Sequence, residues 1–342
     1  MSRRVRTLVV SGVLFVVLFV LALTLPVPYV ILSPGPTINT LGTEQGQQII
    51  VINGKVPNHT TGNLNLTTVD VSTQRLSVFA ALEGWLLHDE VVVPRSSIYP
   101  PGQSQQQVDQ QNTQDFAESQ DNAIAAAFCE LGYPARFGVI LVEADTPALK
   151  KLQPSDVLVK FDGTPISNND QLTALLAKQS PGKQVQIDVL RAGKPVSVTL
   201  TLAAPLTGHT GGRIGIEVGQ VCAASFSVDL GLGNEIGGPS AGLMFALGIM
   251  DKVGTVDLTK GMFIAGTGTI DPTGKVGPIG GIALKMIAAR RKGATVFLAP
   301  AGNCSDVKGA TPKGLDVVKV SALHDAVQDL LALQAGKAVP HC

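Results

Sequence analysis

The chain has 342 residues, of which 45% are hydrophobic and 15% are charged, and its 26 Lys and Arg residues balance 26 Asp and Glu residues. The length suits about two domains of roughly 150 residues, and the apolar content excludes a chain that is disordered throughout. Because the net charge is zero and basic blocks are confined to the N-terminus, nucleic acid is not an expected partner. The 37 glycines and 21 prolines favour strand-rich modules with many loops.

The N-terminus has the pattern of an uncleaved membrane anchor. Three arginines lie among the first six residues, and an apolar run of 18 residues follows from Leu8 to Leu25, which is near the minimum for crossing about 30 Å of hydrocarbon. The alternative is a cleaved signal peptide, whose apolar region is usually only about 7–15 residues long. The arginines favour the cytoplasmic side, so the positive-inside rule predicts a single-pass protein of the cell membrane whose C-terminal domains are extracytoplasmic.

Residues 29–137 are predicted to form a strand-rich segment with a helical insertion. Short strands separated by turns fill its first part, and residues 76–88 have helical spacing. The only tryptophan, Trp85, belongs to this predicted helix, and we expect it in the core. Eight glutamines fall within residues 103–120, and we interpret this part as a partly helical, solvated spacer rather than a binding element.

From Gly138 to Ala203, the sequence predicts strands, a short helix, an amphipathic helix and a hairpin, in that order. The segment LQPSDVLVKFDGTPI at 152–166 resembles the corresponding run of bacterial PDZ domains attached to extracytoplasmic proteases, with Ser155 in place of the usual glycine. The resemblance implies a PDZ-like domain over 138–205 that binds a substrate tail or a partner by strand addition. Recognition of a C-terminal carboxylate stays open, because the loop that would bind it is not evident.

A glycine-rich segment at 237–242 runs into the apolar residues 243–250 and predicts the start of a buried helix. Pro239 suits the first helical position, which places Ser240 in the first turn, where backbone N–H groups lack intrahelical partners. A hydroxyl there can act as a nucleophile beside donors that stabilise an oxyanion. The alternative is an ordinary helix start, where serine is common.

A second glycine-rich segment, 277–281, precedes a predicted helix over 282–292. Lys285 lies at the edge of the apolar stripe of this helix. Apolar surroundings lower the pKa of a lysine, so that its neutral amine can act as a base. Periodicity does not select Lys285 uniquely, because Lys292 lies only about 20° away on the helical wheel. A surface lysine is therefore the alternative.

Residues 264–270 precede a turn and predict a strand that ends in small residues, which let a second backbone or a catalytic side chain approach closely. This region does not fit a Walker A loop, because five residues instead of four separate Gly268 from Gly274, and Lys275 is followed by a valine. Nucleotide binding is therefore not expected.

The three segments together resemble the proteolytic domain of Lon-type peptidases, which use a Ser–Lys dyad. The family motif Pro-Ser-Ala-Gly is present at 239–242, Thr-Gly-x-Ile at 267–270, and Pro-Ile-Gly-Gly-x-x-x-Lys at 278–285. The resemblance implies an α/β Lon-type proteolytic domain over 210–342.

By this resemblance, Ser240 is the nucleophile, Lys285 is the base, and Thr267 is the hydroxyl that orients the lysine amine. Three further residues belong to the nucleophile and oxyanion loop: Gly238, Pro239 and Ala241. The family commonly has an acidic residue at position 237 and a glutamate at position 269, where this chain has glycine and threonine. Neither position carries the nucleophile or the base, so these departures concern substrate contacts.

The histidines and cysteines offer no competing catalytic scheme, and neither a metal nor a cofactor is expected. The histidines form no H-E-x-x-H motif, and none is indicated as the partner of a G-x-S-x-G serine; the five are His59, His88, His209, His324 and His341. The cysteines are widely spaced and form no C-x-x-C motif. In an oxidising compartment they could pair in up to two disulfides, and the alternative is that all four remain free thiols. Their spacing does not indicate the pairing of Cys129, Cys222, Cys304 and Cys342.

The expected fold class is therefore mixed, α+β, with a cytoplasmic tip and transmembrane anchor over 1–28 ahead of the three further segments. The whole chain resembles the membrane-anchored, PDZ-containing Lon-like proteases of Gram-positive bacteria. Because the ATPase module of cytosolic Lon is absent, the resemblance implies an ATP-independent serine endopeptidase that cleaves flexible or unfolded protein segments. The alternative is a catalytically silent scaffold at the membrane. Homo-oligomerisation and the identity of the substrate stay open.

Overall fold

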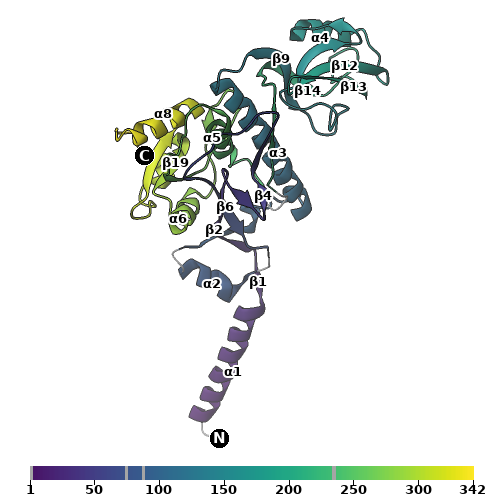
Figure 1. Cartoon of the computed structure of the whole chain (residues 1–342). Helices are drawn as coiled ribbons and strands as arrows, with labels where there is room; N and C mark the ends of the chain where they lie inside the picture. The colour runs from purple at the N-terminus through teal and green to yellow at the C-terminus, as the bar shows by residue number, and fades with distance from the viewer. Residues whose placement is uncertain (1–2, 74–75, 87–88, 233–235) are drawn as a thin grey trace.

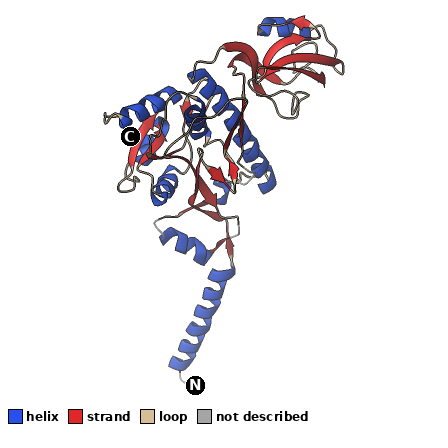
Figure 2. Cartoon of the chain, in the orientation of Figure 1, coloured by secondary structure: helices blue, strands red, loops and turns tan. Residues whose placement is uncertain are grey.

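The computed structural model describes residues 3–73, 76–86, 89–232 and 236–342 of the chain, so the predicted helical residue His88 lies outside the described residues. Helix α1 (Arg3–Thr24) extends away from a central α/β domain, and a smaller strand-rich domain lies at the opposite end (Figure 1; Figure 2). In the described part of the chain, α1 is the one helix that is long and apolar enough to cross a membrane, and none of its side chains is buried.

The central domain is built on a six-stranded sheet in the order β20-β19-β16-β6-β2-β8. The strands are β2 (Tyr29–Asn39), β6 (Asn63–Val71), β8 (Val91–Pro94), β16 (Phe263–Gly266), β19 (Val296–Pro300) and β20 (Asp316–Val320). Strands β6, β16, β19 and β20 are parallel, whereas β2 runs antiparallel to both of its neighbours.

This sheet joins two segments that the sequence analysis treated separately. Half of its strands come from residues 29–94 and half from residues 263–320, so the strand-rich segment at 29–137 and the domain at 210–342 share one sheet. The central contact is the parallel pairing of β6 with β16. A pairing between strands so far apart in the chain leaves no local pattern in either of them.

Helices cover both faces of the sheet. On one face lie α3 (Gln105–Glu130), α5 (Gly242–Val253) and α8 (Leu323–Gln334), and on the other lies α6 (Ile282–Lys292). The strand residues alternate accordingly, because successive side chains point to opposite faces. Ile264 and Leu298 belong to the core around α5, whereas Ala265 and Phe297 belong to the core around α6. Helix α5 is buried along its whole length, as its apolar sequence predicts.

The prediction of a solvated spacer at the glutamine-rich insertion is wrong. This segment belongs to α3, a helix of 26 residues that begins with a capping box between Ser104 and Gln107. The glutamines lie mostly on its exposed side, while Phe116, Ser119 and several alanines are buried against α5. Because glutamines dominate this segment, its sequence does not reveal the apolar stripe that packs against the core.

The smaller domain has the strand order β13-β12-β10-β9-β14 and a core of its own around Phe161 and Ile187. Its elements are β9 (Ala135–Val142), β10 (Val157–Phe161), β11 (Thr164–Pro165), α4 (Asn169–Leu176), β12 (Gln184–Arg191), β13 (Lys194–Thr201) and β14 (Ile216–Cys222). The predicted hairpin is present, and Ala192 and Gly193 both have positive φ at its turn. Strand β14 pairs along all of β9, so the sheet continues beyond residue 205.

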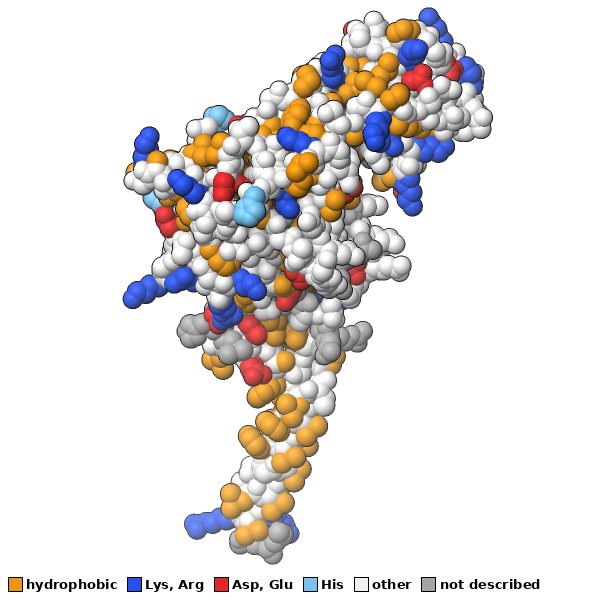
Figure 3. Space-filling view, viewed as in Figure 1, with side chains coloured by type: hydrophobic (Ala, Val, Ile, Leu, Met, Phe, Trp, Pro, Cys, Tyr) orange, Lys and Arg blue, Asp and Glu red, His pale blue; other side chains and the backbone are white. Residues whose placement is uncertain are grey.

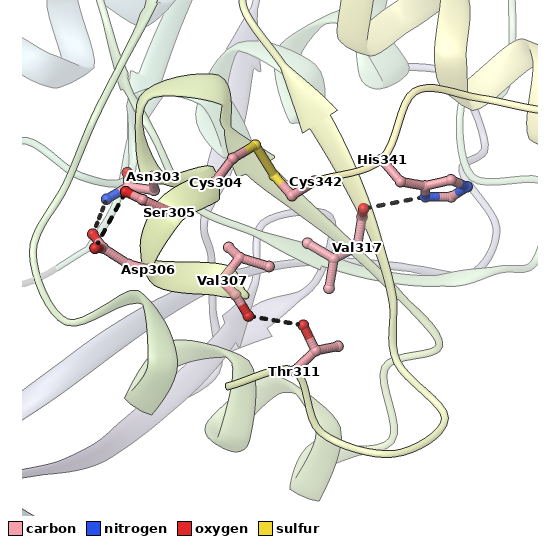
Figure 4. The surroundings of a disulfide bond; sticks show 9 residues. All are labelled: Asn303, Cys304, Ser305, Asp306, Val307, Thr311, Val317, His341 and Cys342. Atoms are coloured by element: carbon pink, nitrogen blue, oxygen red, sulfur yellow. Dashed lines mark hydrogen bonds between the residues drawn. A yellow bond between two sulfur atoms is a disulfide. The ribbon is translucent and has the colours of Figure 1, made fainter. Parts of the chain in front are cut away.

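The four cysteines form two disulfides. Cys129 near the end of α3 is bonded to Cys222 at the end of β14, which ties the smaller domain to the central one. Cys304 is bonded to Cys342, the last residue, and Figure 4 shows the surroundings of this bond. The first of the two alternatives from the sequence, disulfides rather than separate thiols, therefore describes the structure.

The prediction that Trp85 lies in the core is also wrong, since its side chain is 77% exposed on α2 (Val78–Leu86). The segment does form a helix, as its spacing predicts, but the face that α2 buries contains Gly84 instead.

The remaining elements of the described residues are short. They are β1 (Pro26–Val27), β3 (Thr43–Glu44), β4 (Gln47–Gln48), β5 (Ile50–Asn53), β7 (Leu76–Ser77), β15 (Ser227–Leu230), β17 (Thr269–Ile270), β18 (Val276–Gly277) and α7 (Cys304–Val307), with short 3₁₀ turns at Arg95–Ser97 and Ala301–Asn303.

Candidate active site

Ser240 lies in the turn immediately before α5, rather than inside its first turn, because the helix begins at Gly242. Helix α3 contacts this turn through two hydrogen bonds. Gly238 donates its N–H to the Asn112 carbonyl oxygen over 2.8 Å, and Ser119 Oγ donates to the Pro239 carbonyl oxygen, also over 2.8 Å. The glutamine-rich segment therefore positions the predicted nucleophile.

Lys285 lies on α6, which covers the opposite face of the sheet from α5, and its side chain extends to the same turn. Its Nζ lies 2.7 Å from Ser240 Oγ, although 45 residues separate the two in sequence. The Lys285 side chain is only 3% exposed, and burial lowers its pKa to about 8. Lys292, which the helical wheel left as an alternative, is exposed at the end of the helix.

Thr267 links these two groups. It follows β16, is fully buried, and its Oγ1 donates a hydrogen bond to the Ser240 carbonyl oxygen over 3.0 Å. Thr267 Oγ1 in turn accepts a hydrogen bond from Lys285 Nζ over 3.0 Å. Gly268 also donates its N–H to the Ser240 carbonyl oxygen, over 2.9 Å. The backbone of Ser240 is therefore fixed by two donors from the segment between β16 and β17.

One of the small residues predicted at the end of this strand allows close packing of a helix. Gly266 packs directly against α5, where a Cβ atom would come within 2.6 Å of Met244 Sδ. The absence of a side chain lets α5, and with it the turn containing Ser240, lie close to β16.

A cavity of about 320 Å³ opens beside the Ser240 and Lys285 side chains. Its walls come from the loop before α5, the start of α6, and residues 66–70 of β6. Part of the earlier strand-rich segment thus forms the site, which the motifs did not indicate. Asp70 is the one carboxylate among the described residues of its wall, and none of the described histidines lines it.

Two residues that line the cavity have backbone N–H groups without a partner in the described part of the chain. The Gly238 N–H donates to the Asn112 carbonyl oxygen, and Pro239 has no N–H. Among the described residues, the N–H groups of Ser240 and Ala241 have no hydrogen-bond acceptor, since α5 starts only after them. Of the three loop residues predicted by resemblance, only Ala241 therefore has a free donor.

Asn303 supports the site from outside the cavity wall, and no motif indicates it. Its Oδ1 accepts the N–H of Ile279 over 2.9 Å, and its Nδ2 donates to the Ile279 carbonyl oxygen over 2.8 Å. Ile279 lies in the loop that leads into α6, so Asn303 fixes the approach to the helix that carries Lys285. Asn303 is buried beside Cys304, as Figure 4 shows. A single asparagine in a loop gives no signal of this role in a sequence.

Comparison with known families agrees with these observations. Residues 108–202 match the PDZ domain family, and residues 235–333 match the Lon protease (S16) C-terminal proteolytic domain. The chain contains a PDZ domain and a Lon-type proteolytic domain. The first match begins inside α3 and ends before β14, the strand that completes the sheet of the PDZ domain.

Related proteins match the chain over short lengths. The magnetosome formation protease MamE of Magnetospirillum gryphiswaldense is 37% identical over 81 residues, which cover 23% of this chain and 10% of MamE. The Lon protease of Roseiflexus castenholzii is 31% identical over 122 residues, 35% of this chain and 15% of that protein. The mitochondrial Lon protease homolog of Mus musculus is 38% identical over 92 residues, 26% of this chain and 9% of that protein. The chain thus aligns with only a small part of each relative.

Solved structures match the PDZ domain. The PDZ domain of an SdrC-like protein from Listeria monocytogenes is 23% identical, covers 24% of this chain and 86% of that chain, and has a TM-score of 0.23. The HtrA-type protease AlgW, solved with a decapeptide, is 31% identical over 22% of this chain and 25% of its own, with a TM-score of 0.21.

Proposed function

We propose that the protein is a membrane-anchored serine endopeptidase that uses Ser240 and Lys285 as a catalytic dyad. The observation that carries the proposal is the 2.7 Å contact between Lys285 Nζ and Ser240 Oγ at the wall of a cavity. Burial lowers the pKa of Lys285 to about 8, so a substantial fraction of the amine is neutral near physiological pH. The Lon-type domain and its relatives, which are proteases by name, support the same reaction.

In the proposed mechanism, the neutral Lys285 amine accepts the proton of Ser240 as its Oγ attacks the peptide carbonyl. Thr267 accepts one hydrogen bond from the amine, so the amine lone pair is left for the Ser240 hydroxyl. The N–H groups of Ser240 and Ala241 stabilise the oxyanion. Lys285 then protonates the leaving amine and activates the water that hydrolyses the acyl-enzyme.

The PDZ domain supports recruitment of protein or peptide substrates. Among the described strands, β14 pairs only with β9, so its other edge is free to accept an extended peptide as an additional strand. The disulfide between Cys129 and Cys222 attaches this strand to α3, and α3 contacts the loop that contains Ser240. A peptide held at β14 would thus be retained beside the proteolytic domain. We expect flexible or unfolded segments as substrates, and hydrolysis without ATP.

We place the two folded domains outside the cytoplasm, with α1 as an uncleaved anchor. The two disulfides support an oxidising compartment, and the three arginines in the first turn of α1 support a cytoplasmic N-terminus. A protease added to intact cells should therefore digest the chain beyond residue 40. Protection of that whole region would contradict the orientation.

The test of the reaction is turnover of an unstructured protein substrate by the purified full-length chain, in the absence of ATP. Ser240→Ala and Lys285→Ala should each abolish turnover, and the double variant should be no worse than either, because the two residues act as a unit. Lys292→Ala is the matched control, since it removes an exposed lysine from the same helix and should leave turnover unchanged. Normal turnover by Lys285→Ala at any pH would contradict the dyad. An inactive wild type that still binds peptides would favour the scaffold alternative.

A further inference from the structure

Helix α2 exposes an unusually apolar face. The side chains of Phe79, Leu82, Trp85 and Leu86 are 48%, 52%, 77% and 80% exposed. At 100° per residue, these four side chains span an arc of roughly 120° on the helix surface. Large apolar side chains grouped on one helix face indicate a contact surface rather than chance exposure.

The opposite side of α2 is fixed to the protein. Gly84 is buried, and a Cβ at this position would come within 3.0 Å of Ile31 Cδ1 on β2 and 3.2 Å of Val92 Cγ2 on β8. The helix therefore packs closely on two strands of the central sheet through its glycine. This packing directs the apolar arc away from the core.

The position of α2 next to α1 indicates what covers the arc. Helix α1 ends at Thr24, and the next strand, β1, pairs with β7, with Val27 opposite Leu76 and Pro26 opposite Ser77. Helix α2 begins directly after β7, at Val78, so it starts at the level where the chain leaves α1. Figure 1 shows α2 beside the upper end of α1, and Figure 3 shows apolar side chains along α1 up to its junction with the rest of the protein.

We propose that α2 lies in the headgroup region of the bilayer that α1 crosses, with its apolar arc in the lipid. This inference rests on the proposed anchor and adds a second membrane contact to it. Trp85 suits the position, because tryptophan is enriched at the membrane–water interface. An amphipathic helix in this region lies parallel to the bilayer plane and buries its apolar side chains at the boundary of the acyl chains.

The charges beside the arc favour a neutral lipid surface. Glu83 lies at one edge of the exposed face, whereas Asp89 is paired with Arg291 and the Glu90 carboxylate lies beside Gly84 on the packed face. Helix α2 carries no lysine or arginine that would attract anionic headgroups, so the contact depends on apolar burial, and phosphatidylcholine is the appropriate probe.

The same region is connected to the proposed active site. Asp89 forms an ion pair with Arg291 at the end of α6, the helix that carries Lys285. A second membrane contact through α2 would therefore restrict rotation of the proteolytic domain about α1 and hold the cavity at one orientation to the membrane surface.

The experiment uses the fluorescence of Trp85, the only tryptophan of the chain. The full-length protein is reconstituted into phosphatidylcholine vesicles that contain lipids brominated either close to the headgroup or close to the chain terminus. We expect strong quenching by the shallow bromine, weaker quenching by the deep bromine, and little quenching by aqueous acrylamide. Leu82→Glu, which keeps Trp85 as the reporter, should remove most of the lipid quenching, because it puts a carboxylate in the apolar arc.

Three controls separate the outcomes. Trp85→Phe combined with Leu206→Trp moves the reporter to an exposed position after β13, where acrylamide but not lipid should quench it. Trp85→Phe combined with Leu18→Trp tests the anchor, and here the deep bromine should quench most strongly. Leu206→Glu is the charge control for Leu82→Glu and should leave the Trp85 signal unchanged.

If the Leu18→Trp reporter is quenched by lipid while Trp85 is quenched only by acrylamide, the anchor stands and the inference about α2 is wrong. If Trp85 is shielded from both quenchers, a second copy of the chain covers the arc, and the inference is also wrong. If neither reporter is quenched by lipid, both the anchor and the interfacial helix are contradicted.

Discussion

Thr267 donates its hydroxyl proton to the backbone carbonyl oxygen of Ser240 over 3.0 Å. Because this proton is committed, the Thr267 oxygen can only accept a hydrogen bond from the Lys285 amine. The contact therefore does two things. It holds the Ser240 backbone in place, and it leaves the lone pair of a neutral Lys285 for the Ser240 hydroxyl.

Replacing Thr267 by valine should lower kcat by about 10²-fold, the lower part of the range that a positioned general base contributes. The threonine oxygen stabilises the ammonium form by accepting its hydrogen bond, so its loss should also lower the pKa of Lys285 further. The rising limb of the pH–rate profile should then move to lower pH. Thr267→Ser, which keeps the hydroxyl, should restore both kcat and the profile. A valine variant with reduced kcat but an unshifted limb would indicate a purely structural role.

The pH dependence of the wild type follows from the burial of Lys285. Burial lowers its pKa to about 8, and the neutral amine is the active form, so kcat/KM for a short peptide should rise with pH through a single limb with a midpoint near that value. Lys285→Arg should be inactive at every pH between 5 and 10, because arginine keeps its proton in proteins. A limb near 6.5 together with an active arginine variant would indicate a histidine instead.

The same burial has a cost in stability. A lysine whose pKa is about 8 in the folded protein and 10.5 when unfolded disfavours folding most strongly below pH 8, and this effect disappears as the pH rises to 10.5. Lys285→Met should therefore raise the free energy of unfolding by up to about 3 kcal/mol at neutral pH, with a smaller gain at high pH. The thermal unfolding midpoints of the two proteins at pH 7 and pH 10 measure the difference. An equal gain at both values would contradict the assignment.

Asn303 should be required for full activity although it does not line the cavity. Asn303→Ala leaves the partly buried backbone of Ile279 without its two hydrogen bonds, which costs about 1–3 kcal/mol where water does not replace them. We expect a kcat roughly tenfold lower, which corresponds to about 1.4 kcal/mol, with KM little changed. Steady-state kinetics with a short peptide checks this. Cys304→Ser with Cys342→Ser is the comparison, since it removes the neighbouring disulfide but keeps the asparagine contacts.

The sequence motifs selected Ser240, Lys285 and Thr267, and the structure brings their polar groups within hydrogen-bond distance. These three residues could be predicted from the sequence because each lies in a short segment that carries a family motif. The hydrogen bonds by which Asn112 and Ser119 fix the nucleophile loop could not be predicted from the sequence, because they depend on packing between α3 and α5. A glutamine-rich composition gave no indication of that contact.

Trp85 shows a different limit of sequence analysis. The helical spacing around it predicts a helix correctly, but apolar residues at this spacing indicate contact with a core or with lipid equally well. Only the packing of Gly84 against β2 and β8 identifies which side is inside. The pairing of β6 with β16 likewise depends on strands that are distant in the chain.

The measurement that tests the central proposal most directly is the intact mass of the protein after incubation with a serine-reactive acylating probe, followed by mapping of the modified peptide. The account predicts one acyl group on the wild type, located on Ser240, no adduct on Ser240→Ala, and strongly slowed labelling of Lys285→Ala. Labelling of Ser240→Ala at the wild-type rate, or an adduct on another residue of the wild type, would contradict the proposal that Ser240 is the nucleophile.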